Sequence, residues 1–284
     1  MPSAPSARPL RIALVGHVQH ITLGLVPALP RDGEIVHLSD LRWLPGGGSG
    51  VPFWQLLRGP TEVHFFTAFG DDEAGAQVEA ELRATRAQVH AVRRREPHTR
   101  NVVLITPGGE RTILVLGESQ YPRRDDPLPW DLLAGCDAAF FTAQDPEALR
   151  AARAARVLVA ATRRREAIVR SGVKVDVALG SAADEREVCR LADYHPAPSA
   201  LVLTEGGSGG TIETAGGTER FAAPPPVRRR VGSYGAGDSF AAALTFFLAA
   251  GLGVREACDR AGAYGAAVLA GIDPRDHQLP LVRP

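Results

Sequence analysis

The hydrophobic pattern begins with a continuous apolar run at residues 10–15 that ends at Gly16. Such a run is expected of a parallel strand whose two faces are both covered, so it predicts the first strand of a core sheet. Three later segments alternate apolar with polar residues instead: 34–44, 100–106 and 111–116. Alternation is typical of half-exposed antiparallel strands. We therefore predict a small second sheet, a lid, drawn from about residues 33–45 and 99–117.

From about residue 131 the pattern changes to strands and helices in turn. Predicted strands at 138–141, 156–160, 173–179 and 200–203 alternate with predicted helices at 146–154, 163–169 and 183–192. This alternation favours right-handed crossovers, a parallel sheet and helices on both of its faces. We predict an α/β fold of three layers, formed by one domain over residues 1–284. After Gly210 a hairpin is expected at 211–214 and 219–222, and helices close the chain.

Composition limits the partners that the chain can bind. The formal net charge is +0 and the isoelectric point is about 7.1, so no global basic field is available for nucleic acid or an anionic membrane. The longest apolar run, 240–254, falls short of the roughly 20 residues that a membrane helix needs. We therefore expect a small-molecule partner, with no nucleic acid and no membrane.

The cysteines and the first residues indicate a cellular compartment. Cys136, Cys189 and Cys258 are odd in number and form no CxxC pair, which favours reduced thiols over a disulfide framework or a zinc site. Residues 1–9 are rich in Pro, Ser and Ala and lack the pattern of a signal peptide. We expect a cytoplasmic protein whose first residues form a tail.

The segment richest in candidate chemistry is Gly235-Ala236-Gly237-Asp238, which leads into the apolar helix 241–250. Free backbone N–H groups and the helix dipole favour an anion at such a place, so these small residues can hold a phosphate. An aspartate beside an anion hole would repel the phosphate unless it accepts a proton from an attacking hydroxyl. We therefore interpret Asp238 as a general base. The alternative is that Asp238 caps the helix and the glycines serve packing.

The string Gly235-Ala236-Gly237-Asp238-Ser239-Phe240 resembles the second signature of the ribokinase/PfkB family of carbohydrate and nucleoside kinases. Further matches follow in order along the chain: Gly46-Gly47-Gly48, Gly70-Asp71-Asp72 with Gly75, Gly108-Gly109-Glu110-Arg111-Thr112, and Thr204-Glu205-Gly206-Gly207-Ser208-Gly209. The resemblance implies ATP-dependent phosphorylation of a primary alcohol of a sugar or nucleoside, with Mg²⁺ as a cofactor. It also implies a ribokinase-like fold with a β-sheet lid, through which many members form homodimers.

The resemblance also assigns roles to individual residues. The nucleotide is expected against Thr204, Gly206 and Gly209, for which a simple glycine turn is the alternative. The substrate is expected at Gly46, Gly47 and Gly48, for which a flexible loop is the alternative. It is also expected at Gly70 and Asp71, for which a turn with a helix cap is the alternative.

The chain departs from the family pattern at four places. The family motif N-x-x-E, which organises metal and phosphates, is Ser181-Ala182-Ala183-Asp184 here, so Asp184 is the candidate for Mg²⁺. Its alternative is a helix cap by Ser181 with Asp184 at the third position. The aspartate that grips sugar hydroxyls is replaced by His17-Val18-Gln19-His20, and an asparagine of the glycine signature is replaced by Val51-Pro52. The aspartate that opens the second signature is Gly232, which predicts loss of monovalent-cation activation.

Other classes of protein fit less well. The string around Ser208 spells G-x-S-x-G, the nucleophile elbow of hydrolases, but an elbow must turn into a helix and a hairpin is expected here. A P-loop is excluded because the only lysine, Lys174, lies inside a predicted strand. A non-catalytic relative that binds a nucleotide or metabolite is the remaining alternative, favoured by the altered substrate and metal motifs.

Overall fold

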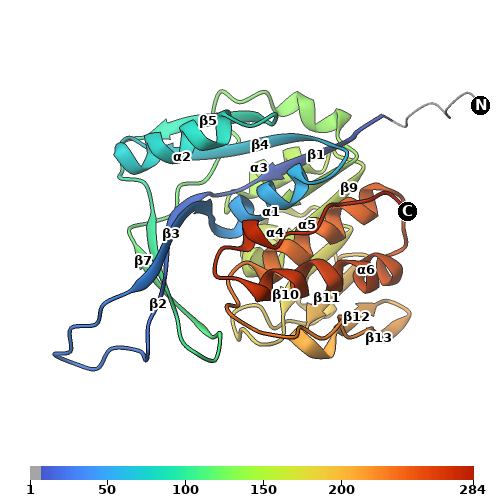
Figure 1. The fold of residues 1–284 in the computed structure, drawn as a ribbon. Coiled ribbons are helices and arrows are strands. Elements are labelled where there is room, and N and C mark those ends of the chain that lie inside the picture. Colours follow the sequence, from blue (N-terminus) through green and yellow to red (C-terminus); the bar gives the residue numbers. More distant parts are fainter. Residues whose placement is uncertain (1–7) are drawn as a thin grey trace, which may run out of the picture.

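The computed structural model describes residues 8–284, so the tail expected at 1–9 lies almost wholly outside the described residues. The chain forms a nine-stranded sheet, a four-stranded sheet and helices packed on the larger sheet (Figure 1). The strand order of the large sheet is β13-β12-β11-β10-β9-β8-β1-β4-β5. The α/β architecture and the separate lid sheet predicted from the sequence are confirmed.

The large sheet is parallel from β5 to β11 and ends in an antiparallel hairpin. Its strands are β1 (Leu10–Val15), β4 (Thr61–Gly70), β5 (Gln88–Arg94), β8 (Ala138–Phe141), β9 (Val157–Ala161), β10 (Val177–Ser181), β11 (Ala200–Thr204), β12 (Gly210–Thr214) and β13 (Gly217–Phe221). The carboxyl ends of the parallel strands all meet at one edge, which is where ligands bind in open α/β sheets.

Both faces of this sheet are buried, as the continuous apolar run of β1 predicts. Ile12 and Leu14 belong to one hydrophobic cluster, whereas Ala13 and Val15 belong to the other. The first cluster lies under α1 (Gly47–Leu57), α2 (Glu73–Arg83), α5 (Ala236–Ala249) and α6 (Val254–Ala267). The second lies under α3 (Pro146–Ala152), α4 (Arg165–Ser171) and the 3₁₀ turn Trp130–Gly135. The result is the expected three-layer arrangement.

The lid sheet has the order β3-β2-β6-β7, formed by β2 (Gln19–Leu25), β3 (Ser39–Gly46), β6 (Arg100–Ile105) and β7 (Arg111–Leu116). The sequence analysis missed β2, because its polar start was interpreted only as a substrate-facing segment. It also expected antiparallel pairing throughout, whereas β2 pairs with β6 in parallel. A third hydrophobic cluster joins the lid to the core through Ile105, Tyr234 and Ile272.

The helix predicted at 183–192 is wrong. This segment consists of turns and coil until the 3₁₀ turn Leu191–Asp193. Short polar side chains bind nearby amides instead: the Ser181 hydroxyl accepts from the amide of Ala183, and the Asp184 carboxylate accepts from the amide of Arg186. Such local bonds compete with helical ones. Because this helix does not form, the helix cap considered for Ser181 and Asp184 is also wrong.

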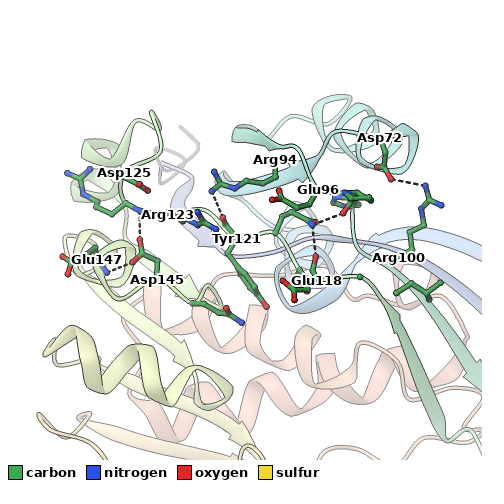
Figure 2. A pocket seen from close by; sticks show the side chains of 18 residues that line it. Asp72, Arg94, Glu96, Arg100, Glu118, Tyr121, Arg123, Asp125, Asp145 and Glu147 are labelled. Atoms are coloured by element: carbon green, nitrogen blue, oxygen red, sulfur yellow. Dashed lines mark hydrogen bonds and ion pairs between the residues drawn. The ribbon is translucent and has the colours of Figure 1, made fainter.

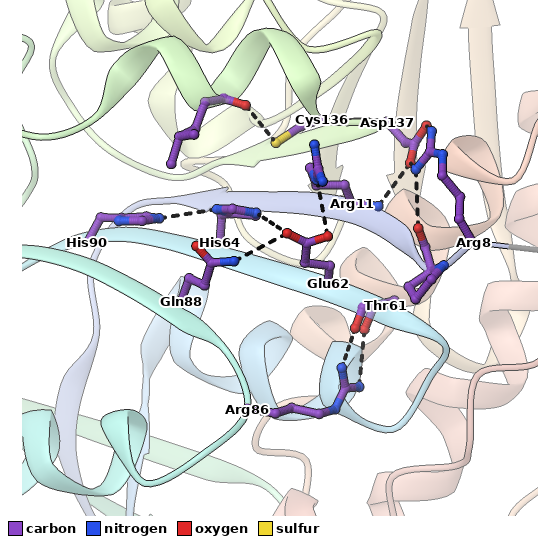
Figure 3. Close-up of polar contacts among 12 residues, drawn as sticks. Arg8, Arg11, Thr61, Glu62, His64, Arg86, Gln88, His90, Cys136 and Asp137 are labelled. Atoms are coloured by element: carbon purple, nitrogen blue, oxygen red, sulfur yellow. Dashed lines mark hydrogen bonds and ion pairs between the residues drawn. The ribbon is translucent and has the colours of Figure 1, made fainter.

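A polar cluster lies near the amino ends of β1 and β4, far along the strands from the carboxyl edge (Figure 3). His64 Nδ1 lies 3.2 Å from His90 Nε2, and its Nε2 lies 3.1 Å from Glu62. Glu62 is also 3.2 Å from Arg11. Every polar group in this chain of contacts has a partner, so the cluster joins the strands β1, β4 and β5.

Cys136, Cys189 and Cys258 are free and buried. Burial raises the pKa of Cys136 and of Cys258 to about 12. Within residues 8–284, every helix is too short or too polar to cross a membrane.

Candidate active site

The centre of the site is the start of α5. Gly235 precedes the helix with φ 81°, a left-handed conformation that favours glycine. A Cβ at Gly235 would also meet Pro274 and Val51 at about 3 Å. The helix behind it is almost wholly buried and is followed by Gly251 with φ 96°. A buried helix thus fixes the position of its first turn.

The first amides of α5 remain available. Among residues 8–284, no partner binds the N–H groups of Gly235, Ala236 and Gly237, whereas the amide of Ser239 already donates to the carbonyl of Gly235. Gly237 is exposed, and a Cβ there would meet open space. The structure therefore brings the three residues of the predicted anion hole together at an open helix start.

Asp238 lies in the first turn of the same helix and is partly buried. Burial raises the pKa of Asp238 to about 6; Glu187 adds to the rise, and Arg111 and Arg163 oppose it. Its carboxylate has no hydrogen-bond partner in the part of the chain that the structure describes, and it makes no cap for α5. The capping alternative is therefore wrong, and the side chain is free to take up a proton.

Two arginines and one glutamate set the charge around Asp238, and the sequence analysis did not single out any of the three for this role. Arg111 comes from the lid strand β7 and donates to the Ser233 hydroxyl at 3.3 Å. Arg163 follows β9 and lies 2.7 Å from Glu187. Glu187 also accepts from the amide of Ser181 at 2.9 Å. Glu187 was missed because the helix predicted at 183–192 would have placed it one helical turn after Asp184, the residue that matches the family motif.

The predicted nucleotide loop follows β11. Thr204 ends the strand, and its amide carbonyl accepts from Ala182 of the neighbouring loop. Gly206 has φ 58° with open space beyond its Cα, whereas Gly209 has φ 80° and packs against the carbonyls of Phe221 and Ala222. A ligand can therefore approach the backbone at Gly206.

This loop also decides against a hydrolase. After Ser208 the chain enters strand β12, which pairs antiparallel with β11. A nucleophile elbow requires a helix at this point. Ser208 is therefore a turn residue.

The glycines at the start of α1 differ from expectation. The amide of Gly47 donates to the Tyr234 hydroxyl at 2.9 Å, and that of Gly48 donates to His17 Nε2 at 3.2 Å. Gly46 precedes the helix, and a Cβ there would lie 2.4 Å from the Tyr234 hydroxyl. Substrate hydroxyls would have to displace these protein partners, which argues against the substrate role predicted for Gly46, Gly47 and Gly48.

Gly70 and Asp71 are placed by packing. A Cβ at Gly70 would lie 2.1 Å from the backbone nitrogen of His98, which explains the glycine. The Asp71 side chain is 66% exposed and lies 3.6 Å from Arg93. The next residue, Asp72, caps α2 by accepting from the amide of Gly75 at 2.9 Å. The geometry thus favours the turn with a helix cap over a substrate contact at these two residues.

Asp184 does not fit a magnesium site. Its carboxylate lies 2.5 Å from Arg163 and 3.0 Å from Arg186. Hydrogen bonds from Arg186 are the main reason that the pKa of Asp184 lies well below its usual range. A carboxylate held by two guanidinium groups has no free oxygen to direct at a cation, so the metal role predicted for Asp184 finds no support in this geometry.

Polar groups at and just before the start of β2 fill the place where the family aspartate is missing. Gln19 donates to the Ser119 hydroxyl at 2.9 Å and accepts from the Asn101 amide at 2.8 Å. His17 is buried and lies edge-on to Tyr121 at 5.2 Å. Burial, with the positive charges of Arg164 and Arg163, lowers the pKa of His17 to about 3. This side of the site therefore holds neutral hydrogen-bonding groups in place of a carboxylate.

A wide cavity of about 1400 Å³ opens next to these groups, between the lid and the loop that follows β7 (Figure 2). Its wall includes Asp72, Arg94, Glu118, Tyr121 and Gln144. Asp238 and the amides of α5 are not among its lining residues. Tyr121 contacts both this cavity and His17, so it separates the cavity from the inner part of the site.

Comparison with known proteins agrees with this geometry. The pfkB family carbohydrate kinase profile matches residues 131–278. The fold is similar to ribokinase from Thermotoga maritima (TM-score 0.76, 15% identity, 95% of this chain and 96% of that one). It is also similar to adenosine kinase from Sinorhizobium meliloti (TM-score 0.73, 17% identity, 98% and 97%). A third similar structure is Arabidopsis thaliana ribokinase complexed with ribose and ATP (TM-score 0.70, 15% identity, 96% and 96%).

A comparison with curated proteins gave no match in sequence. The profile nevertheless spans just over half of the chain, and the described fold extends the similarity over nearly all of it. The chain belongs to the pfkB family of carbohydrate kinases, phosphotransferases that use an alcohol as acceptor.

Proposed function

We propose that this protein transfers the terminal phosphoryl group of ATP to a hydroxyl of a small sugar, nucleoside or related alcohol, with Asp238 as general base. The observation that carries the proposal is a carboxylate with a pKa of about 6 in the same helical turn as three amides, none of which has a hydrogen-bond partner within residues 8–284. A base whose pKa lies slightly below neutral pH is ionised and still able to accept a proton.

The proposed step follows from these positions. Asp238 takes the proton of the acceptor hydroxyl, and the oxygen forms a bond to the terminal phosphorus of ATP. The bond from that phosphorus to the bridging oxygen breaks, and ADP leaves. The amides of Gly235, Ala236 and Gly237 donate to the phosphoryl oxygens, whose charge they stabilise.

The nucleotide is proposed to lie along Thr204, Gly206 and Gly209, because Gly206 leaves its backbone open to a ligand. Arabidopsis ribokinase, which has a similar fold, was crystallised with ATP. Mg²⁺ is proposed to enter bound to the nucleotide phosphates, whose charge it neutralises. Asp184 is then not needed as a ligand, in keeping with its two arginine partners.

The direct test is the variant Asp238→Asn, which keeps the shape of the side chain. ADP release over a panel of sugars, nucleosides and polyols should fall by about 10²–10⁴ in rate. The affinity for a non-hydrolysable ATP analogue, measured by calorimetry, should stay within about threefold, because the amides are unchanged. Equal turnover by the variant would contradict the role of Asp238.

The second candidate is a non-catalytic relative that binds a nucleotide or metabolite. It is favoured by the protein partners of the Gly47 and Gly48 amides and by the arginine partners of Asp184. A wild-type protein that binds the ATP analogue but releases no ADP with any acceptor would establish this candidate and exclude the kinase.

We further propose a homodimer through the lid. The edge strand β7 exposes four consecutive apolar side chains by 39–59%: Ile113, Leu114, Val115 and Leu116. An apolar edge strand of this kind pairs readily with another chain. Light scattering after gel filtration should give twice the chain mass of 30.1 kDa, and Leu114→Glu should give a monomer. A wild-type monomer at high concentration would contradict the dimer.

A further inference from the structure

The helices α1 and α5 both begin in the site, but only α5 leaves its first amides open. The first amides of α5 have no partner in the described part of the chain. The first three amides of α1 are all bound by other residues: Gly47 donates to the Tyr234 hydroxyl at 2.9 Å, Gly48 to His17 Nε2 at 3.2 Å and Ser49 to the His17 carbonyl at 3.2 Å. Since the amides of a helix start are donors for ligand oxygens, the protein itself closes the start of α1.

The Tyr234 hydroxyl lies where a ligand hydroxyl would otherwise bind. The side chain is 5% exposed and packs in the third hydrophobic cluster with Ile21 and Ile105. A Cβ on Gly46 would collide with this hydroxyl, so the close approach requires a glycine there. Burial raises the pKa of Tyr234, and the negative charge of Asp238 adds to the rise. The phenol therefore stays neutral, and it lies within electrostatic reach of the proposed base.

His17 closes the next amide in the same way. Its side chain is 8% exposed, and the ring lies edge-on to Tyr121 with 5.2 Å between the ring centres. Burial lowers the pKa of His17 to about 3, so the ring is neutral at physiological pH. A neutral imidazole whose Nε2 accepts a hydrogen bond carries its hydrogen on Nδ1. Titration of Tyr234 or His17 therefore opens neither amide near neutral pH.

The neighbouring polar side chains are bound to one another. Gln19 donates to the Ser119 hydroxyl at 2.9 Å and accepts from the Asn101 amide at 2.8 Å. The hydroxyls of Ser49 and Thr142 lie 2.7 Å apart. A ligand with several adjacent hydroxyls would have to break one of these bonds for each hydroxyl that it places here, because donors and acceptors that are already paired have little left to offer.

Two adjacent amides suit two adjacent hydroxyls, and Tyr234 and His17 already supply the two acceptor atoms at this place. We propose that these two side chains determine specificity: they exclude a vicinal diol from the start of α1 and select an acceptor in which no vicinal pair of hydroxyls accompanies the reacting one. This inference rests on the proposed kinase function and narrows its acceptor to deoxy sugars, deoxynucleosides and simple alcohols with separated hydroxyls.

The test compares acceptors in matched pairs that differ by one hydroxyl of a vicinal pair. The pairs are D-ribose with 2-deoxy-D-ribose, adenosine with 2′-deoxyadenosine, and glycerol with 1,3-propanediol. Two measurements are made on each compound: ADP release with ATP, and the thermal shift produced with a non-hydrolysable ATP analogue present, which does not need turnover.

In the wild type, the diol of each pair should be preferred by no more than about threefold in kcat/KM or Kd, because no protein group waits for the second hydroxyl. Tyr234→Phe keeps the ring and frees the amide of Gly47, so it should shift the ratio toward the diol by about 3- to 10-fold, as expected for one hydrogen bond. His17→Leu frees the amide of Gly48 and should shift the ratio in the same direction by a similar factor.

The matched control is Tyr264→Phe. Tyr264 is also a buried tyrosine, but its hydroxyl donates to the carbonyl of Pro280 at 3.2 Å, in the first hydrophobic cluster. Its variant should leave the ratio within each pair unchanged. A loss of packing alone would weaken both members of a pair equally, so the ratio separates a role in specificity from a role in stability.

A wild-type preference for the diol above about threefold in any pair would overturn the inference, since a site that binds a hydroxyl discriminates strongly against the analogue without it. A ratio that neither Tyr234→Phe nor His17→Leu changes would also overturn it. So would the absence of both binding and turnover for every probe. Thermal shifts that follow the expected order in wild type and variants, but without ADP release, would support the inference while the proposed kinase function fails.

Discussion

The pH dependence of the reaction depends directly on Asp238. Its pKa of about 6 lies above the ordinary aspartate value of 3.8, chiefly because of burial. A base must be ionised to accept a proton, so kcat/KM should fall as the pH decreases through about 6. At pH 7 about nine-tenths of the carboxylates are ionised and at pH 5 about one-tenth, which predicts a roughly tenfold loss between these values. An aspartate with an ordinary pKa would lose less than about one-tenth of its activity over the same range.

The assay measures ADP directly by chromatography between pH 4.5 and 8, because coupling enzymes have pH profiles of their own. Arg111 provides a matched perturbation, since it is the strongest of the charges that lower the pKa of Asp238. Arg111→Met should therefore move the acidic limb of the profile to higher pH. A rate that stays flat down to pH 5, with the protein still folded, would refute the assignment of Asp238. An acidic limb that does not move in Arg111→Met would refute the electrostatic part of the reasoning.

Three further predictions concern the same region. Folding raises the pKa of Asp238 from 3.8 to about 6, so ionisation of this carboxylate destabilises the fold increasingly as the pH rises from 3.8 to about 6. Asp238→Asn should therefore increase the free energy of unfolding at pH 7.5, by at most about 3 kcal/mol, and change it little at pH 4. Calorimetry at both pH values checks this. Gly237→Val should lower the affinity for the ATP analogue by about tenfold or more, because the side chain enters the open space in front of the amides. The control is Gly253→Val, at another open helix start. Equal affinities of the two variants for the analogue would contradict the anion hole. Asp184→Asn should leave the Mg²⁺ concentration for half-maximal activity within about twofold, since its oxygens contact Arg163 and Arg186; a large increase would restore Asp184 as a metal ligand.

The sequence predicted most of the fold because local patterns determine most of it. The two-sided burial of β1 and the strand-helix alternation after residue 131 are visible in the order of apolar residues alone. The segment 183–192 was predicted wrongly because short polar side chains bind nearby amides there in place of helical hydrogen bonds. The ion pairs of Asp184 and Glu187 with Arg163 also join residues that are distant in sequence. Strand β2 was missed because its pairing with β6 is nonlocal.

In the site, too, local patterns could be predicted from the sequence, whereas contacts between distant residues could not. The helix start at Gly235 to Asp238 is a local motif; α5 begins there at Ala236, five residues before the start predicted from the apolar run. The partners of Gly47 and Gly48 come from Tyr234 and His17, far away along the chain, so no spacing in the sequence predicts them.

The tip of the lid has two links to the segment that leads into α5. Glu110 lies 2.7 Å from Arg230, and Arg111 contacts Ser233. Both links join residues that are far apart in the sequence, so the position of the lid strand β7 and the charge beside Asp238 are set together. A substitution in the lid that displaces Arg111 should therefore change the protonation of Asp238 as well as the contacts of the lid.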